Sequence, residues 1–226
     1  REGKRMEDAV RDHVYSLNDK RYEKICRISK YLSHEIPNNG SVMTQCFGET
    51  IIGMMARTLK EEEKNVRFLC PETRPYFQGA RLTATVLSEM GFDTTVITDN
   101  MPAFVMRKES IDVFTSAADA ITMDGYVVNK VGTLGIAICA KYFGVKTYVT
   151  GDPDKFHKTI DDVKIEMRDP KFSLEAMGIR TATDGVKGYY PAFDITPPSL
   201  IDGIVTDIGI YNPLNLKQLF FVRSGE

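Results

Sequence analysis

Apolar residues in the first 35 positions recur at the spacing of an α-helix. They are separated mostly by three or four residues and lie among many charged side chains: Val10, Val14, Leu17, Ile25, Ile28 and Leu32. Apolar residues on one face of a helix recur at this spacing. The pattern predicts one long helix or two over residues 2–35, ending before Pro37, and the sequence IPNNG that follows predicts a turn.

From residue 41 onward, short apolar runs alternate with helical patterns. The runs that predict strands are SVMTQ (41–45), VRFLCPE (66–72), DTTVITD (93–99), IDVFTSA (111–117) and KTYVTG (146–151). The patterns that predict helices are ETIIGMMARTLKEE (49–62), QGARLTATVLSEMG (78–91), MPAFVMRK (101–108) and KVGTLGIAICAKYFG (130–144). Strands that alternate with helices form parallel βαβ units. We therefore expect an α/β fold with a doubly wound parallel sheet and right-handed crossovers.

The remainder of the chain predicts less regular structure. Residues 152–200 contain five prolines, and we expect long loops there with one returning strand near Val163–Glu166. Thr196 is followed by two prolines in TPPSLIDGIVTDIG, which predicts the N-cap and first turn of a last helix.

Charge and composition exclude several classes of function. The 226 residues carry a formal net charge of −2, so no basic field is available for a nucleic acid or an anionic membrane surface. No apolar run approaches the roughly 20 residues that cross a bilayer. The four cysteines are far apart and the three histidines lack metal-ligand spacing, so neither a disulfide scaffold nor a metal site is expected. Cys26, Cys70 and Cys139 are interpreted as buried thiols in a reducing cytoplasm.

Polar residues collect where the predicted strands end. They are Thr44, Gln45 and Cys46 after the first strand; Glu72, Thr73 and Arg74 after the second; Thr98, Asp99 and Asn100 after the third; and Asp119 after the fourth. Ligands of doubly wound sheets bind beyond the carboxyl ends of the strands. No glycine-rich dinucleotide or nucleoside-triphosphate motif follows a strand. The chemistry is therefore expected at one edge of the sheet, without such a cofactor.

Cys46 lies between a predicted strand and a predicted helix that begins near Gly48. The dipole of a helix at this place lowers the pKa of a thiol, which would make Cys46 a usable base or nucleophile. The alternative is that Cys46 is a small buried apolar side chain.

Four other positions have a functional and a structural interpretation. Asp119 lies among alanines, where it either titrates high and acts as a general acid or closes an Asx turn. Asn129 and Lys130 precede a predicted helix, and form either an anion site or an N-cap followed by a solvated lysine. Arg74 either clamps a phosphate or stabilises its own loop in a salt bridge.

Four blocks of the sequence together carry a resemblance to a known family. They are ETRPYFQGARLTATVL, TVITDNMPAFVM, SAADAITMDGYVVNKVGTLGIAICAK and YPAFDITPPSLIDGIVTDIGI. Over roughly residues 40–212, with the right spacing between blocks, the chain resembles methylthioribose-1-phosphate isomerase. The wider family includes ribose-1,5-bisphosphate isomerase, enzymes like 5-deoxyribose-1-phosphate isomerase, and the regulatory subunits of eukaryotic translation initiation factor 2B.

The resemblance implies a Rossmann-like catalytic domain, which would be residues 39–226. It also implies a helical domain before it, of which residues 1–38 would be a remnant, since the sequence does not begin with Met. The implied partner is a small sugar phosphate, and the implied assembly is a homodimer that needs no metal or organic cofactor.

The resemblance further implies the roles of individual residues. The catalytic cysteine and aspartate of the family map to Cys46 and Asp119, and substrate contacts map to Gln78, Asn129 and Lys130. The expected reaction is the aldose–ketose isomerisation of a 5-substituted ribose 1-phosphate, such as the 5-methylthio or 5-deoxy compound, to the ribulose 1-phosphate.

The chain departs from the family pattern at the implied site. Gln45 stands where the family has histidine, Phe47-Gly48-Glu49 replaces N-A-G, and Ala117 replaces the glycine of G-A-D. An upstream phosphate-binding loop and a further arginine of the isomerase do not occur in this sequence, either because that part was cleaved or not included or because this homologue lacks it. These changes bear on the identity of the substrate more than on catalysis, because the cysteine and the aspartate are both present.

Two alternatives to this function remain open. A ribose-1,5-bisphosphate isomerase would differ in its substrate alone and would need extra donors for a second phosphate. A non-catalytic sugar-phosphate or nucleotide sensor would resemble the initiation-factor subunits. Those subunits usually lack the cysteine–aspartate pair, so the presence of the pair favours an enzyme.

Overall fold

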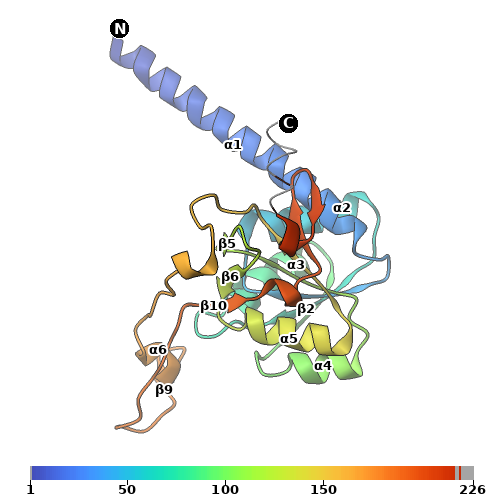
Figure 1. Ribbon diagram of the computed structural model, residues 1–226, viewed down its shortest axis with the longest axis vertical. Coiled ribbons are helices and arrows are strands. Elements are labelled where there is room, and N and C mark those ends of the chain that lie inside the picture. The colour runs from blue at the N-terminus through green and yellow to red at the C-terminus, as the bar shows by residue number, and fades with distance from the viewer. Residues whose placement is uncertain (1, 217–218, 220–226) are drawn as a thin grey trace.

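The computed structural model of the chain describes residues 2–216 and 219, and its centre is a seven-stranded sheet (Figure 1). The strand order is β12-β11-β7-β4-β1-β2-β3, in which β12 runs antiparallel to β11 and the other neighbours are parallel. The strands are Ser41–Gln45 (β1), Arg67–Pro71 (β2), Asp93–Ile97 (β3), Val113–Ala117 (β4), Lys146–Thr150 (β7), Gly203–Thr206 (β11) and Gly209–Tyr211 (β12). The expected α/β fold with a doubly wound, mostly parallel sheet is confirmed.

Helices cover both faces of this sheet because successive strand residues point to opposite faces. Val42 of β1 and Phe68 of β2 pack in one core with α2 and α3, whereas Met43 and Leu69 pack in a second core with α4 and α5. The helices are Glu49–Glu61 (α2), Thr85–Glu89 (α3), Pro102–Lys108 (α4) and Thr133–Phe143 (α5), and a π-helix, η1, covers Gly79–Ala84 directly before α3. Strands that are buried on both faces in this way read as continuous apolar runs, which is why the sequence predicted them.

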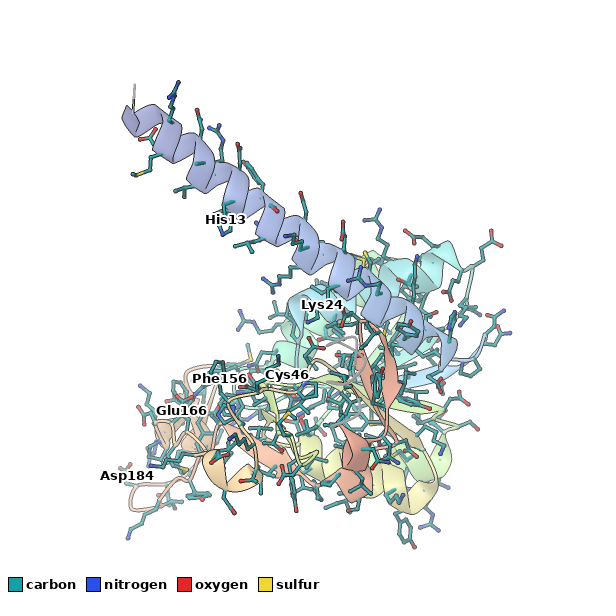
Figure 2. All side chains as sticks on the ribbon, turned by 45° about the horizontal axis from the view of Figure 1, so that its top comes forward. His13, Lys24, Cys46, Phe156, Glu166 and Asp184 are labelled. Carbon is teal, nitrogen blue, oxygen red and sulfur yellow. The ribbon has the colours of Figure 1, made fainter. Side chains whose placement is uncertain are left out.

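The first helix, α1, spans Glu2–His34 without interruption. Its second half packs on α2, and Ile28 and Leu32 are buried there. Its first half projects from the body, as Figure 1 shows and as the side chains along it in Figure 2 make clear. Val10, Val14 and Leu17 are therefore exposed, although they share the helical spacing of the buried residues.

A second, three-stranded antiparallel sheet stands beside the carboxyl end of β4. It consists of Ala120–Ile121 (β5), Val127–Lys130 (β6) and Phe193–Thr196 (β10), with β6 in the middle. Between β7 and β10 the chain makes a long excursion that contains α6 (Lys171–Leu174) and the hairpin Glu175–Ala176 (β8) and Ile179–Arg180 (β9). Short 3-10 turns cover Ile160–Asp162, Pro198–Leu200 and Pro213–Asn215.

Two predicted elements are wrong, and a third begins later than predicted. The returning strand near Val163–Glu166 is irregular chain. The last helix predicted from Thr196 is a 3-10 turn followed by strand β11, because Ile204 and Val205 are fully buried as a parallel neighbour of β7. The helix predicted from Lys130 begins at Thr133, and the residues before it form β6.

The apolar sequence PLNLKQLFFV (213–222) predicts packing in a subunit interface or over the core, and its residues 217, 218 and 220–222 lie outside the described part of the chain. Within the part of the chain that the structure describes, no helix is both long enough and apolar enough to cross a membrane.

Candidate active site

The candidate site lies where the order of the strands reverses. The chain runs from β1 outward to β2 and β3, and then returns to place β4 on the other side of β1. The helices that follow β1 and β4 therefore leave on opposite faces, which opens a crevice at the carboxyl ends of these two strands. A cavity of about 410 Å³ occupies this place. Its walls are formed by Cys46, Phe47, Gly48, Gln78, Leu82, Ala117, Ala118, Asp119, Asn129, Lys130, Arg168 and Phe193.

The cavity brings together all five residues that the sequence singled out as a site. Cys46 follows β1, Asp119 follows β4, Gln78 precedes η1, and Asn129 and Lys130 end β6. These residues come from four separate parts of the chain. The expectation that Cys46 and Asp119 face a single pocket at the strand ends is confirmed, while their chemical roles remain predictions.

The backbone of Cys46 is held in a conformation that non-glycine residues rarely adopt. Its φ is +58°, in the left-handed region. The Cys46 N–H donates to Thr73 Oγ1 at 3.2 Å, and the Cys46 carbonyl accepts from Thr83 Oγ1 at 2.5 Å. Thr73 itself has a φ of +63°, and Thr83 belongs to the π-helix η1. Strained backbone and π-helical turns both occur preferentially at functional sites.

The expected lowering of the Cys46 pKa is wrong. Burial raises the pKa of the Cys46 thiol above its usual value, and the neighbouring Asp119 carboxylate raises it further. The backbone N–H of Phe47 and the ammonium of Lys130 oppose this rise without cancelling it. Helix α2 begins only at Glu49, so Cys46 does not occupy its first turn, where the dipole acts. At neutral pH the side chain is consequently a neutral thiol.

Asp119 lies in the short connection between β4 and β5. Its backbone N–H donates to the carbonyl of Val128 at 2.9 Å, which fixes the residue on the neighbouring strand β6. Burial raises the pKa of the carboxyl group, and Lys130 and Arg168 partly offset the rise. The direction agrees with the expectation for a general acid. Among the residues that the structure describes, the carboxylate has no hydrogen-bond partner.

Asn129 and Lys130 occupy a strand, not the start of a helix. The predicted Asn129 N-cap is therefore wrong, and Gly132 takes that position with a φ of +107°. Asp194 on β10 satisfies the helix start instead, since its carboxylate accepts from the N–H groups of Gly132 at 2.7 Å and Leu134 at 3.2 Å. Lys130 is not solvated either, because only 4 % of its surface is exposed.

Several polar groups in the cavity wall have no partner within the described chain. Two of them are buried, the Lys130 side chain and the side-chain oxygen of Gln78, whereas the Cys46 thiol is half-buried and Asp119 is exposed to the cavity. The Asn129 amide differs, because its Nδ2 donates to Thr133 Oγ1 at 3.0 Å. Buried polar groups in folded proteins are nearly always hydrogen-bonded. Unpartnered groups that converge on one cavity therefore indicate a polar ligand.

Arg168 also lines the cavity, and the sequence did not indicate it. It lies in the irregular segment after the 3-10 turn Ile160–Asp162, where no periodicity exists to orient a side chain. Its guanidinium donates to Glu166 from Nε and from Nη2, each at 3.0 Å. The only signal in the sequence is the alternation of charges in EMRDP, and this pattern is common on exposed loops.

Three further residues are not at this cavity. The Arg74 guanidinium donates to the carbonyls of Phe172 at 3.3 Å and Glu175 at 2.8 Å, so Arg74 stabilises the excursion, although not through the predicted salt bridge. Phe77 lines a separate cavity of about 640 Å³, and Met101 is an exposed residue before α4. Phe47, in contrast, lies in the wall of the candidate cavity.

The departures from the family pattern lie in and behind the cavity wall. Gln45 is buried behind Cys46, with its Nε2 donating to the carbonyl of Val131 at 3.2 Å. Gly48 and Ala117 face one another, and a Cβ on Gly48 would lie 2.9 Å from the Cβ of Ala117. The resembled motifs have alanine and glycine at these two positions, in the opposite arrangement.

Comparison with known proteins shows that the sequence is similar to those of one protein family and its isomerase relatives. Residues 2–213 match the sequence profile of the Initiation factor 2 subunit family. The chain is 43 % identical over 189 residues to a 5-deoxyribose 1-phosphate isomerase of Clostridium botulinum, which covers 81 % of this chain and 54 % of that protein. It is 38 % identical over 206 residues to a methylthioribose-1-phosphate isomerase of Chloroflexus aurantiacus, which covers 84 % of this chain and 58 % of that protein.

A solved structure agrees with these sequence matches. The 5-methylthioribose 1-phosphate isomerase of Pyrococcus horikoshii superimposes with a TM-score of 0.85 at 33 % sequence identity, and the match covers 92 % of this chain and 62 % of that one. The chain thus spans little more than half the length of the curated relatives that it matches.

Proposed function

Because the chain belongs to the Initiation factor 2 subunit family, whose matched relatives include sugar-phosphate isomerases, we propose that it is an aldose–ketose isomerase. The proposed substrate is a ribose 1-phosphate with a small substituent at C5, and 5-deoxyribose 1-phosphate is the first candidate. The relative at 43 % identity carries that name. The observation that carries the proposal is the single cavity that joins Cys46, Asp119 and an unpartnered lysine at the strand ends.

Asp119 is proposed as the general acid. The substrate carries phosphate on its anomeric carbon, so its ring cannot open as a free hemiacetal does. Protonation of the ring oxygen makes that oxygen a leaving group and lets the C1–O bond break. A carboxyl group whose pKa is raised by burial keeps its proton at higher pH than an exposed one, which suits this step. A general acid of this kind contributes typically ~10²–10⁴-fold in rate.

Cys46 is proposed to act between C2 and C1. After ring opening, the hydrogen at C2 must reach C1 while the C2 hydroxyl becomes a carbonyl and releases its proton. The hydrogen moves either as a proton, which requires a base at C2, or as a hydride, which leaves only the hydroxyl proton to be taken up; the Asp119 carboxylate, having given its proton to the ring oxygen, can accept that proton. Because burial raises the pKa of Cys46, little thiolate exists at neutral pH, and this favours the hydride route with Cys46 next to the migrating hydrogen.

Gln78, Asn129 and Lys130 are proposed to hold the sugar phosphate. The ammonium of Lys130 is buried without a hydrogen-bonded acceptor in the described chain, and an anionic ligand would supply one. The buried oxygen of Gln78 can accept from a sugar hydroxyl, and the free oxygen side of the Asn129 amide can do the same. The apolar side chains of Phe47, Leu82 and Phe193 cover the remaining wall and limit the access of water.

A non-catalytic sensor is the second candidate, favoured by the family's description as initiation-factor subunits. A sensor needs the phosphate and hydroxyl contacts, but it needs neither an acid nor a thiol. Turnover therefore separates the two functions, since a sensor would bind the same compounds and return them unchanged.

The test is an isomerisation assay of the intact protein with 5-deoxy-, 5-methylthio- and 5-phospho-ribose 1-phosphate. We expect ketose formation from the first two compounds and weak activity on the third. The described cavity wall offers only two cations, Lys130 and Arg168, and these are too few to balance the charges of two phosphate dianions. Equal or faster turnover of the 5-phospho compound would identify a ribose-1,5-bisphosphate isomerase. Binding of all three without turnover would identify a sensor.

A further inference from the structure

A second cavity lies between the loop after β2 and the hairpin of β8 and β9, which Figure 1 shows at one end of the molecule. Its volume is about 640 Å³, larger than the 410 Å³ of the candidate active site and within the roughly 300–1,000 Å³ of ligand pockets. We call it the hairpin cavity, and its wall includes Glu72, Tyr76, Phe77, Phe172, Glu175 and Met177.

The hairpin cavity is separate from the candidate active site, and no described residue lines both. The segment that covers residues 76–82 lies between them. Phe77 and Arg81, four residues apart and joined by a hydrogen bond of 2.7 Å from the Arg81 N–H to the Phe77 carbonyl, line the hairpin cavity. Gln78 and Leu82, also four residues apart, line the candidate active site. Residues at this spacing share one face of a helical turn, so each face of the segment belongs to a different cavity.

Arg74 holds the two walls of the hairpin cavity together. Its Nη2 donates to the carbonyls of Phe172 at 3.3 Å and Glu175 at 2.8 Å, and its backbone N–H donates to Asp99 at 2.6 Å. The rings of Tyr76 and Phe172 also pack edge to face across the two walls, with 5.3 Å between their centroids. The cavity is therefore built by two segments that are distant in the sequence and fixed to each other.

Two carboxylates without a partner line this cavity. Among the described residues, neither the side chain of Glu72 nor that of Glu175 accepts a hydrogen bond or forms an ion pair. Both side chains are half-buried. Burial raises the pKa of Glu72 and the Asp99 carboxylate raises it further, whereas Arg74 opposes the rise. A cation beside these carboxylates would be screened by water less than one on an open surface.

The charge of the described wall is negative. Arg81 is the one cation in it, so two carboxylates against one guanidinium leave a net charge of −1. Arg81 is also exposed, and its Nη1 donates to the carbonyl of Tyr76 at 3.4 Å. Water screens an exposed charge more than a half-buried one. A positively charged ligand therefore complements this wall.

The apolar part of the wall is mainly aromatic, and its rings are those of Tyr76, Phe77 and Phe172. Aromatic faces attract cations, and two of these rings already do so within the chain. The guanidinium carbon of Arg74 lies 5.4 Å from the centroid of Phe77, and the ammonium of Lys171 lies 5.2 Å from that of Phe172. A ring has two faces, so a chain cation on one face leaves the other for a ligand.

We propose that the hairpin cavity binds an organic ammonium ion with an apolar body. The ammonium lies beside Glu72 and Glu175, and the apolar body packs on the rings of Phe77 and Phe172. This site does not rest on the proposed isomerase function, because none of its residues takes part in the proposed catalysis.

Calorimetric titration with three small compounds tests the preference for a cation. They are 2-phenylethylammonium, 2-phenylethanol and 3-phenylpropionate, which are similar in size and carry a positive charge, no charge and a negative charge. The ammonium should bind with a dissociation constant on the order of 1 mM, which a ligand of this size reaches at ordinary efficiency. The alcohol should bind about threefold to tenfold more weakly, and the anion more weakly still.

Two variants test the wall of the cavity. Glu175→Gln keeps the backbone carbonyl that Arg74 holds, and it should weaken binding of the ammonium about threefold to tenfold while leaving binding of the alcohol unchanged. Phe172→Leu keeps an apolar side chain without a ring, and it should weaken binding of the ammonium more than that of the alcohol. If Phe172→Leu lowers the thermal midpoint, the comparison with Glu175→Gln decides.

Two controls show whether the effect is specific and where the ammonium binds. Asp184→Asn removes a fully exposed carboxylate of the same excursion outside the cavity, and it should change the affinity by less than about twofold. Asp119→Asn removes the carboxylate of the candidate active site, and it should also leave the affinity unchanged.

Four results would overturn the proposal. They are binding of the alcohol as tight as that of the ammonium, equal affinities of Glu175→Gln and Asp184→Asn for the ammonium, a loss of affinity in Asp119→Asn, and no binding of the ammonium to the unmodified protein at millimolar concentration. A loss in Asp119→Asn would place the ammonium in the candidate active site.

Discussion

A methyl group on Gly48 would lie 2.9 Å from the Cβ atom of Ala117, closer than two such carbon atoms approach in folded proteins. Gly48 follows the proposed catalytic Cys46 by two residues, and Ala117 precedes Asp119 by two. The two segments that carry the proposed catalytic pair thus touch through one methyl group. The spacing between these segments therefore depends on whether residue 48 or residue 117 carries the methyl group.

We predict that Gly48→Ala alone lowers stability by about 1–3 kcal/mol, as other overpacked cores do, and reduces turnover. Ala117→Gly alone should open a small gap and cost less. The double variant, which moves the methyl group to the other side, should recover most of both losses. Denaturant unfolding and turnover of the four forms give the coupling energy. Gly53→Ala serves as a control, because nothing lies within 4 Å of its added Cβ. Additive losses in the double variant would disprove the compensation.

The hydroxyl of Thr83 holds the carbonyl of Cys46, and we predict that Thr83→Val lowers turnover by at least about tenfold. Valine keeps the shape but leaves the carbonyl without its donor, which costs about 1–3 kcal/mol when the group is buried. Cys46 then loses part of the support for its left-handed backbone. Thr85→Val removes a similar hydrogen bond, to the carbonyl of Arg81, on an exposed surface, and should leave turnover unchanged. Equal effects of the two substitutions would argue against a role in positioning Cys46.

Asp194 should make stability depend on pH between about 4 and 6. Burial raises the pKa of Asp194 to about 6 in the folded protein, although the N–H groups of Gly132 and Leu134 oppose the rise. Folding therefore takes up a proton in this range, so this contribution to stability is present below pH 4 and is lost as the pH rises to 6. The loss is at most about 3 kcal/mol. Asp194→Asn should flatten the pH profile of the unfolding free energy, whereas the fully exposed Asp184→Asn should not.

Cys46→Ser should lose about 10²–10⁴-fold in turnover, because a hydroxyl is a poorer partner for a migrating hydrogen or proton than a thiol. Its thermal midpoint should change little by comparison. Since burial raises the pKa of Cys46, alkylation by iodoacetamide should be slow at neutral pH and should accelerate above pH 9. Bound sugar phosphate should block it. Cys139→Ser, outside the cavity, is the control, and equal turnover in both variants would leave Cys46 with a packing role only.

The sequence predicted five of the seven strands of the main sheet, mostly because their apolar runs are buried, although the edge strand β3 is largely exposed. The runs at 41–45, 66–72, 93–99, 111–117 and 146–151 all contain the observed strands. It failed where a short segment takes its structure from a distant partner. Val127–Lys130 is a strand because it pairs with Ala120–Ile121 and Phe193–Thr196, and local periodicity does not record that pairing.

In the candidate site, too, residues placed by a regular strand could be predicted, and a residue placed by an irregular segment could not. Cys46 and Asp119 could be indicated because each follows a strand, and the carboxyl ends of parallel strands share one edge. Arg168 could not be indicated, since an irregular segment brings it to the cavity and only Glu166 and two aromatic rings orient it. The pKa of Cys46 was misjudged because burial, which the sequence does not show, outweighs the distant start of α2.

The most direct measurement is the time course of 5-deoxyribose 1-phosphate with the unmodified protein, Asp119→Asn and Asp161→Asn, followed by the appearance of the ketose. Asp161 is an exposed carboxylate outside the cavity and serves as the charge control. We expect ketose from the unmodified protein and from Asp161→Asn, and none above background from Asp119→Asn, which should still bind the substrate within about tenfold, or 1.4 kcal/mol. Ketose formation by Asp119→Asn at a rate near that of the unmodified protein would show that Asp119 is not the general acid.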